Sequence, residues 1–206
     1  MTAITAGLIA DTHIPYRAKQ LPEAVFEAFA GVDIILHAGD VDDPAALEPL
    51  RSIAPVHAVR GNVHFLDLSD GGASLPKVIK LELAGKRVVL THGHQPGLGG
   101  FIIKGTRFLV NWAGLLDNGW LNQWNARRLA RDYPKADIIV FGHAHRAYVD
   151  WIDDTLLVNP GAVAESGRPE QPSVARLEIA HQPTVEIIPL PTSKLGGKLW
   201  LRTRPR

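Results

Sequence analysis

The sequence predicts an α/β fold, and two patterns support that prediction. In residues 3–59, short apolar runs alternate with segments of helical spacing, which is the order typical of parallel strand–helix–strand units. From residue 78 onward, short apolar runs follow one another across turn residues, as they do in antiparallel hairpins. A chain of 206 residues can bury one substantial core. We therefore expect a single domain over residues 1–206.

Three apolar runs predict the first strands: residues 3–10, 32–36 and 56–59. Between the first two, Pro22 is expected at the first helical position and Gly31 just past the helix end. Between the second and third, Asp43 directly before Pro44 predicts a helix cap, with the orientation of a metal ligand as its alternative role. The alternation predicts that the three strands are parallel neighbours.

The second half of the chain predicts a different arrangement. Residues 78–83 and 87–91 flank Gly85 as the arms of an antiparallel hairpin would. The apolar run at residues 136–141 predicts a fully buried strand. Four more short strands are expected toward the C-terminus, at residues 147–151, 155–158, 173–179 and 184–189.

Two segments depart from the strand pattern. Residues 97–132 carry aromatic and leucine side chains at helical spacing, so we expect a helical insert of two helices there. Their apolar stripe predicts packing on the body of the domain or on a second copy of the chain, which would make a homo-oligomer through this tryptophan-rich insert. Residues 191–206 are rich in basic side chains and are expected to form a C-terminal tail.

Composition excludes several classes of function. The formal net charge is +1, so electrostatics give no reason to expect nucleic acid or a membrane surface as a partner. Without cysteine, the chain has no disulfides, thiolate metal sites or thiol nucleophiles, and any metal must be held by oxygen and imidazole. No stretch reaches the roughly 20 apolar residues of a membrane span, and the N-terminus lacks the pattern of a signal peptide. We expect a cytoplasmic protein.

Polar side chains follow the predicted strands, at the ends where open α/β sheets carry their sites. They are Asp11, His13, Asp40, Asn62, His92, His143 and His145. Residues two apart on extended backbone point to one side, so His143 and His145 are expected to present both rings to one pocket. Four imidazoles, two carboxylates and one amide are too many for one four-coordinate ion but suit two divalent ions with a bridging carboxylate. We expect Mn, with Ni, Zn, Fe or Co as alternatives.

The order and spacing of five motifs resemble those of the calcineurin-like metallophosphoesterases. The motifs are Asp-x-His at 11–13, Gly-Asp-x-x-Asp at 39–43, Gly-Asn at 61–62, Thr-His-Gly-His at 91–94 and Gly-His-x-His at 142–145. Within that family the chain is similar to the small bacterial and archaeal phosphodiesterase branch, which also carries Asn-Pro-Gly-Ser. The resemblance covers about residues 4–190 apart from the helical insert.

The resemblance implies a four-layer α/β/β/α sandwich of two mixed sheets flanked by helices. It implies that one ion is held by Asp11, His13 and His145. The other would be held by Asn62, His92 and His143, with Asp40 shared, and His94 would lie over the substrate phosphoryl group. The implied activity is that of a binuclear-metal phosphohydrolase, more a phosphodiesterase than a monoesterase, in which a metal-bridging hydroxide attacks phosphorus in line.

The chain departs from the family directly after Asn62. Many members place a histidine there that assists departure of the leaving group, and this chain has Val63 followed by His64. Valine cannot transfer a proton. We therefore expect His64 or His94 to act as the general acid, or the site to prefer leaving groups that need little protonation.

The sequence leaves three questions open: whether the protein is an enzyme or a scaffold, what Asn159 does, and what the insert does. The segment 11–22, with its run Ile14-Pro15-Tyr16-Arg17, also resembles the retromer-complex subunit of this fold, which implies a catalytically silent interaction scaffold. All seven ligand positions here nevertheless keep ligating side chains. Asn159 either fixes a metal histidine through backbone contacts or only shapes a turn. The insert could form a lid, because a related enzyme that cleaves a lipid-linked nucleotide pyrophosphate carries helices at a similar point. The expected substrate is then a small phosphoester, with or without an apolar group.

Overall fold

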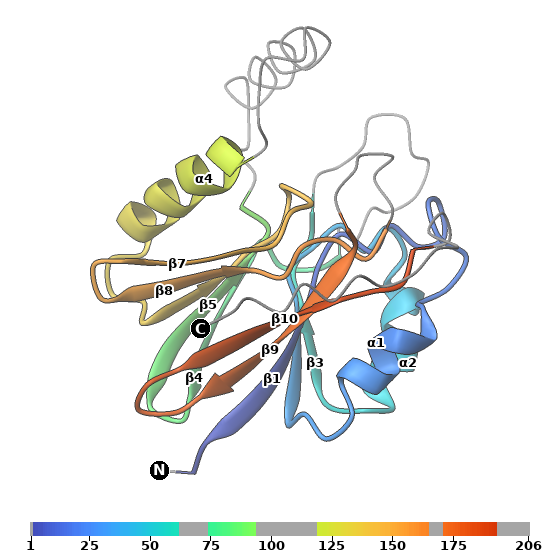
Figure 1. Cartoon of the computed structure of the whole chain (residues 1–206), viewed down its shortest axis with the longest axis horizontal. Helices are drawn as coiled ribbons and strands as arrows, with labels where there is room; N and C mark the ends of the chain where they lie inside the picture. Colours follow the sequence, from blue (N-terminus) through green and yellow to red (C-terminus); the bar gives the residue numbers. More distant parts are fainter. Residues whose placement is uncertain (1, 62–73, 94–118, 165–170, 193–206) are drawn as a thin grey trace, which may run out of the picture.

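In the computed structural model, residues 2–61, 74–93, 119–164 and 171–192 are described, and they form two five-stranded mixed sheets with flanking helices (Figure 1). The first sheet contains β1 (Ile4–Ile9), β2 (Ile34–His37), β3 (Val56–Ala58), β9 (Ser173–Ile179) and β10 (Thr184–Pro189). Its strand order is β10-β9-β1-β2-β3, and β1, β2 and β3 are parallel, as predicted. Strand β9 pairs antiparallel with both β1 and β10.

The second sheet has the strand order β4-β5-β6-β8-β7. Its strands are β4 (Val78–Leu83), β5 (Lys86–Thr91), β6 (Ile138–Val140), β7 (Tyr148–Ile152) and β8 (Thr155–Asn159). Strands β5, β6 and β8 are parallel, whereas β4 and β7 pair antiparallel at the two edges. The predicted β4–β5 hairpin is confirmed, and its turn residues Ala84 and Gly85 both have positive φ, as a tight hairpin turn requires.

The helices near the first sheet begin and end slightly differently from the prediction. Helix α1 spans Glu23–Ala28, and Pro22 precedes it as the cap because its ψ of 144° is extended. Gly31 lies beyond the helix in a left-handed conformation, three residues later than the last helical residue. Asp43 caps the next segment through its side chain, but that segment begins as a 3-10 helix (Pro44–Leu47) before α2 (Glu48–Arg51).

Three apolar layers hold the sandwich together. Strand β1 shows the principle, because Leu8 points into the layer between the sheets while Ile9 points to the layer under α1 and α2. A strand covered on both faces needs no polar positions, which explains its continuous apolar run. The third layer lies between the second sheet and helix α4 (Gly119–Asp132), where Leu129 packs near Ile139. This order of layers is the predicted α/β/β/α sandwich.

Helix α4 accounts for the C-terminal part of the predicted insert. Its buried Ala126 and Leu129 pack on the second sheet, so this part of the insert forms the outer layer of the fold. The other predicted helix, Trp112 and the tail after residue 192 lie outside the described residues. Within the described ranges, no helix combines the length and the apolar content needed to cross a bilayer.

Candidate metal centre

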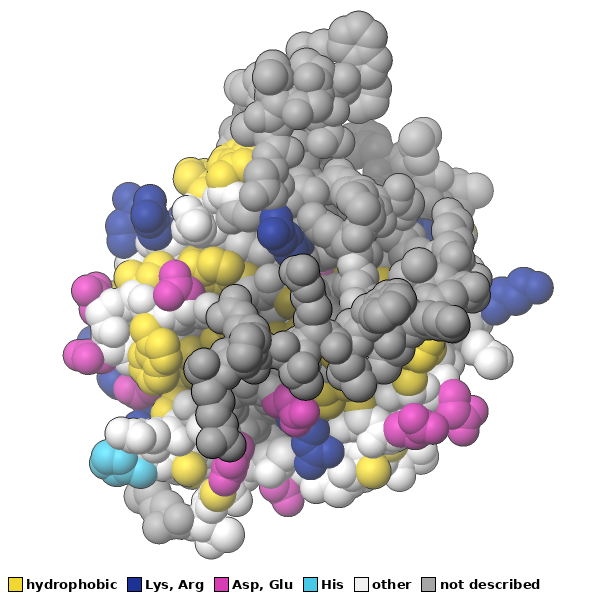
Figure 2. Space-filling view, viewed as in Figure 1, with side chains coloured by type: hydrophobic (Ala, Val, Ile, Leu, Met, Phe, Trp, Pro, Cys, Tyr) yellow, Lys and Arg dark blue, Asp and Glu magenta, His cyan; other side chains and the backbone are white. Residues whose placement is uncertain are grey.

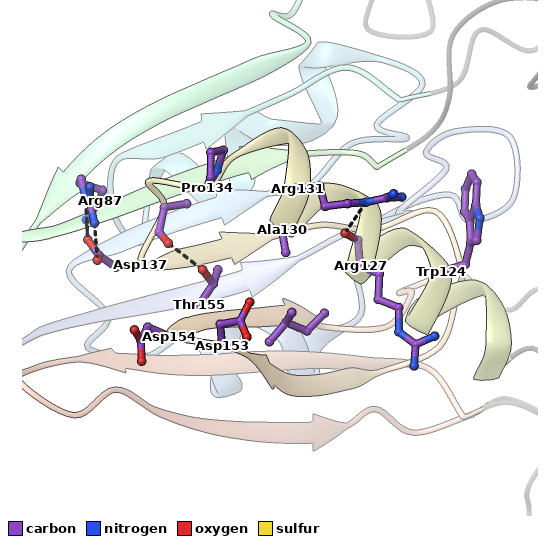
Figure 3. Close-up of a pocket in the computed structure, with 12 residues that line it drawn as sticks. Arg87, Trp124, Arg127, Ala130, Arg131, Pro134, Asp137, Asp153, Asp154 and Thr155 are labelled. Atoms are coloured by element: carbon purple, nitrogen blue, oxygen red, sulfur yellow. Dashed lines mark hydrogen bonds and ion pairs between the residues drawn. The ribbon is translucent and has the colours of Figure 1, made fainter.

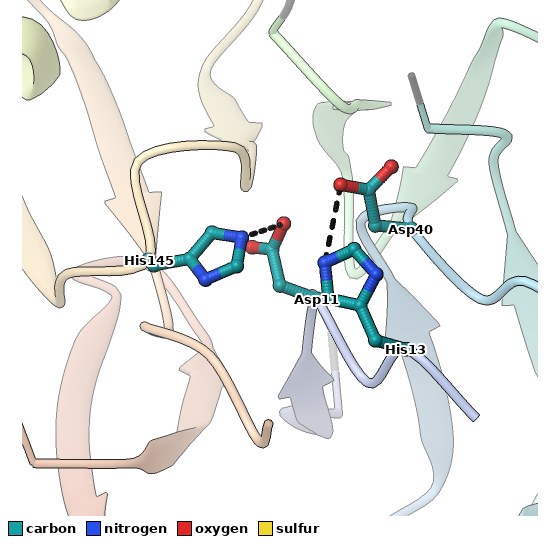
Figure 4. Close-up of side chains that lie close together, drawn as sticks. All are labelled: Asp11, His13, Asp40 and His145. Carbon is teal, nitrogen blue, oxygen red and sulfur yellow. Dashed lines mark ion pairs between the residues drawn. The ribbon is translucent and has the colours of Figure 1, made fainter. Parts of the chain in front are cut away.

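The predicted ligands meet because they follow parallel strands of two packed sheets. Asp11 and His13 come after β1, Asp40 after β2, His92 after β5, and His143 and His145 after β6. Carboxyl ends of parallel strands share one edge of a sheet, and the two sheets bring their edges together. Four of these side chains, Asp11, His13, Asp40 and His145, lie close together (Figure 4). One ligating atom from each of them lies within 4.8 Å of the other three.

Asp40 lies between two groups of imidazoles. Its Oδ2 atom is 3.5 Å from Nε2 of His13 and also 3.5 Å from Nε2 of His92. On one side the His13 ring lies near the His145 ring, with centroids 5.3 Å apart, and His145 Nε2 is 3.3 Å from Asp11 Oδ1 (Figure 4). On the other side the rings of His92 and His143 are 5.2 Å apart. A single carboxylate oxygen is thus approached from two sheets.

The prediction that paired ligands share an extended backbone is wrong. Asp11, His13, His143 and His145 have φ values of 53°, 48°, 74° and 55°, and Asp40 has 56°. In this left-handed conformation residues two apart do not point the same way, so the His143 ring contacts His92 whereas the His145 ring contacts His13. Left-handed backbone costs non-glycine residues about 1–3 kcal/mol each and persists where surrounding contacts enforce it, commonly at functional sites.

Contacts between distant segments enforce this conformation. The backbone N–H of His143 donates to Asp11 Oδ2 at 3.1 Å, and the N–H of Asp11 donates to the Gly39 carbonyl at 2.9 Å. The N–H of His13 donates to the Asp40 carbonyl at 3.0 Å. The loops therefore hold one another, and none of these conformations is set by the local sequence alone.

Three glycines leave room for the ligands. A Cβ atom at Gly61 would lie 1.7 Å from Asp40 Oδ1, and one at Gly39 would lie 2.7 Å from Nδ1 of His92. A Cβ atom at Gly142 would lie 3.0 Å from Asp11 Oδ2. The backbone thus packs directly against the ligating groups, so the site is a tight cradle that a side chain at any of these positions would fill.

The carboxylates in this cradle are ionised although they are buried. Burial alone would raise the pKa of Asp11, but the charge and hydrogen bond of His145 hold that pKa below its ordinary value. Burial opposes ionisation of Asp40 as well, and His92 outweighs it and holds the pKa of Asp40 well below the usual range. Burial would lower the pKa of His92, but the Asp40 carboxylate raises it to about 9. Ionised oxygens beside imidazoles are the donor set that divalent transition metals prefer, so these residues fit such ions.

His37 is buried close to the site, but its two ring nitrogens contact groups other than the candidate ligands. Its Nδ1 accepts a hydrogen bond from the Gly39 N–H at 3.2 Å, and its Nε2 lies 3.2 Å from the Thr12 hydroxyl. Burial lowers the pKa of His37 to about 4, so the ring is neutral at physiological pH. The ring therefore supports the loop that carries Asp40.

Sequence reasoning missed two contributors to the site. Asp42 is buried, and its Oδ1 is 3.3 Å from Nδ1 of His13. The neighbouring Asp43, which the sequence offered for that role, caps a helix instead. Asn122 of α4 is the other, because its amide contacts Asn159 and the loop that carries the histidine pair. The only sequence signal for Asp42 was a second carboxylate two residues after Asp40.

Three predicted residues cannot be placed. Asn62, His64 and His94 lie outside the described residues, so their roles stay predictions. Asn62 directly follows Gly61, whose backbone is packed against Asp40.

A pocket of about 790 Å³ lies elsewhere on the fold, between α4, the segment that follows it and the turn between β7 and β8 (Figure 3). Its lining includes Trp124, Arg127 and Arg131 of α4, with Asp153 and Asp154 from the turn between β7 and β8. None of the candidate ligands that the structure describes lines this pocket, so it is separate from the cluster around Asp40.

Comparison with known proteins identifies relatives that are described as phosphoesterases. A model of the calcineurin-like phosphoesterase superfamily domain matches residues 4–182. A Methanothermobacter thermautotrophicus protein, described as a probable metallophosphoesterase, is 32% identical over 195 residues, which cover 94% of this chain and 90% of the archaeal protein.

Solved structures show the same fold. A Streptococcus pneumoniae protein, described as a predicted phosphoesterase, is similar with a TM-score of 0.58 and 22% identity over 92% of this chain and 91% of that one. Vps29 from Entamoeba histolytica, solved in complex with Zn²⁺, is similar with a TM-score of 0.58 and 18% identity over 90% of this chain and 99% of that one. At these identities the likeness concerns the fold.

Proposed function

Because the chain belongs to the calcineurin-like phosphoesterase superfamily, we propose that it is a binuclear-metal phosphohydrolase that acts on phosphodiesters. One observation carries the proposal. Asp40 Oδ2 lies 3.5 Å from an imidazole nitrogen on each side, so one carboxylate can serve two ions. Isolated buried carboxylates are costly, and paired cations are the compensation that this arrangement fits.

We assign the ligands in two groups around Asp40. One ion would be held by Asp11, His13 and His145, and the other by His92, His143 and Asn62. Two divalent ions bound in this way supply a nucleophile from water near neutral pH and positive charge for the phosphoryl oxygens. Mn is the metal we expect, with Ni, Zn, Fe or Co as alternatives, because all of them accept imidazole and carboxylate ligands.

Hydrogen bonds orient two of the imidazoles for this task. His92 Nδ1 donates to the Ala38 carbonyl at 2.8 Å, so Nε2 is the nitrogen that faces Asp40. His13 directs Nδ1 to Asp42 and Nε2 to Asp40. A metal-binding histidine commonly gives its other nitrogen to a carboxylate or a carbonyl, and both patterns are present here.

The substrate we propose is small. On the face shown in Figure 2, acidic and basic side chains of the described residues are interspersed. These side chains therefore do not concentrate charge of one sign, as a polyanion-binding surface does. His64 or His94 is our proposed general acid for the departing alcohol. An apolar group on the substrate is compatible with this proposal but is not required by it.

A panel of phosphomonoesters and phosphodiesters tests the proposed activity. Metal-free protein is reloaded with Mn²⁺, Ni²⁺, Zn²⁺ or Mg²⁺, and kcat/KM is measured for each substrate. We expect the highest values with an aryl phosphodiester and Mn²⁺, and the lowest with Mg²⁺, because Mg²⁺ accepts imidazole poorly. A fully loaded protein that cleaves no phosphorylated compound would overturn the proposal, and a preference for monoesters would correct it.

Substitution of Asp42 tests how His13 is oriented. We expect Asp42→Ala to weaken Mn²⁺ binding by about 10- to 100-fold, because the imidazole loses the carboxylate that fixes its ring and raises its basicity. Titration calorimetry on metal-free protein measures this affinity. The adjacent Asp43→Ala is the matched control, since it removes a helix cap, costs about 1 kcal/mol of stability and leaves metal affinity unchanged. Equal loss of affinity in both variants would contradict the assigned role.

The alternative function is a catalytically silent interaction scaffold of the same fold. The likeness to Vps29 favours it only at the level of fold. Two apolar side chains on the edge strand β7, Val149 and Trp151, are 42% and 51% exposed and would suit a protein partner. A scaffold, however, has no need for two ionised buried carboxylates beside imidazoles, so we retain the enzyme as the leading proposal.

A further inference from the structure

The loop at residues 142–146, which we call the histidine loop, carries His143 and His145 and must hold two left-handed residues in place. Its first residue is bound to the residue that follows β5, since the Gly142 N–H donates to the His92 carbonyl at 3.3 Å. Its third residue, Ala144, donates back to the Gly142 carbonyl at 2.9 Å. The last residue, Arg146, accepts a hydrogen bond at its carbonyl from a residue outside the loop.

Two buried asparagines bind both ends of the histidine loop. Asn159, at the end of β8, donates through Nδ2 to the Gly142 carbonyl at 3.0 Å and to Asn122 Oδ1 at 3.1 Å. Asn122, in α4, donates through its own Nδ2 to the Arg146 carbonyl at 2.9 Å. The two amides therefore form a continuous hydrogen-bonded link from residue 142 to residue 146, across the outside of the histidine pair.

The hydrogen-bonding capacity of this pair is almost fully used. Asn159 Oδ1 accepts from the Gly161 N–H at 3.0 Å, and both amide hydrogens of Asn159 have acceptors. Asn122 and Asn159 are 1% and 0% exposed. A satisfied buried polar network fixes a single geometry, because any rearrangement would leave a buried amide without a hydrogen-bond partner, which is costly.

We propose that Asn122 and Asn159 are positioning residues for the metal centre, and that Asn122 makes the placement of His145 depend on helix α4. Asn122 lies in the first turn of α4, so a shift of this helix end moves the Arg146 carbonyl and with it the neighbouring His145. The inference rests on the proposed function and deepens it, because the ion held by His145 would be bound less tightly when the link is broken.

Asn122 is the better residue to substitute. Asn159 also shapes the turn at Gly161, so its loss would disturb more than the histidine loop. We expect Asn122→Ala, and the similar-sized Asn122→Leu, to weaken one of two Mn²⁺ binding events by about 10- to 100-fold while the other is retained. Titration calorimetry on metal-free protein measures both events, and thermal unfolding reports whether the variants fold.

Asn125→Ala is the matched control. Asn125 lies on the same helix and is also buried, and its Nδ2 has no hydrogen-bond partner in the part of the chain that the structure describes. We expect this variant to bind both ions with the affinities of the parent protein. The dependence of activity on Mn²⁺ concentration is a second measurement for the Asn122 variants. A misplaced ligand raises the Mn²⁺ concentration needed for half-maximal activity, and excess Mn²⁺ restores part of kcat.

Each outcome decides between named alternatives. An Asn122 variant that folds and binds both ions like the parent would overturn this inference and leave the proposed function intact. Failure of both Asn122 variants to fold, with Asn125→Ala folded, would also overturn it, because the pair would then hold the fold rather than the loop. A parent protein that binds no divalent ion would instead overturn the proposed function on which the inference rests.

Discussion

Asp40→Ala is expected to abolish hydrolysis by the metal-loaded protein, with a fall in kcat/KM of about 10³-fold or more, equivalent to roughly 4 kcal/mol of lost transition-state stabilisation. The reason is geometric, because Asp40 lies 3.5 Å from imidazole nitrogens on both sides of the site, and no other carboxylate of the described residues is recorded in such a position. Its loss removes a ligand from both proposed ions at once. Metal content per chain should fall together with activity.

A surface carboxylate provides the control for this variant. Asp137 pairs with Arg87 at 2.9 Å, but the two side chains are 30% and 58% exposed, so solvent screens their attraction and the pair adds little to stability. Asp137→Ala should therefore keep the parental metal content and kcat/KM. If Asp40→Ala retained parental hydrolysis, the Asp40 cluster would not be the active site. That result would favour the interaction scaffold as the role of this fold.

The fold could be predicted from the sequence because the central strands of both sheets are covered on both faces. Strands β1, β2 and β6 therefore read as continuous apolar runs, which are recognisable without knowledge of their neighbours. Their parallel pairing then predicted that the polar residues after each strand would meet, and Asp11, Asp40 and His145 do lie together. This convergence in space depends only on the direction of the strands.

The local geometry of the site could not be obtained in the same way. The left-handed conformation of His143 depends on a hydrogen bond to Asp11, which is 132 residues away in the chain. Asp42 and Asp43 are equivalent in sequence, and only the contact between Asp42 and His13 separates their roles. A periodic pattern predicted helix α4, but it did not indicate that Asn122 reaches the histidine loop. These features depend on contacts between distant segments, which periodicity does not report.

Gly61→Ala is expected to remove metal binding and to lower kcat/KM by about 10²-fold or more, although Gly61 contributes no ligand. The Cβ atom of alanine would lie 1.7 Å from Asp40 Oδ1 and 2.3 Å from the Asp40 backbone nitrogen. The Asp40 side chain could rotate away from the new methyl group. The Asp40 backbone nitrogen, however, cannot move without displacing the whole loop that carries Asp40. Overpacking of this kind also costs about 1–3 kcal/mol of stability.

Gly31→Ala separates this local effect from general destabilisation. Gly31 has a φ of +75°, so alanine there costs roughly 1–2 kcal/mol through backbone strain, but its Cβ atom would meet nothing within 4 Å. The two variants should therefore unfold at similarly lowered temperatures. Only Gly61→Ala should lose Mn²⁺ binding by calorimetry, because only there does the new methyl group occupy the space of Asp40. Parental Mn²⁺ affinity in Gly61→Ala would show that the Asp40 loop is not held in the position on which a shared carboxylate depends.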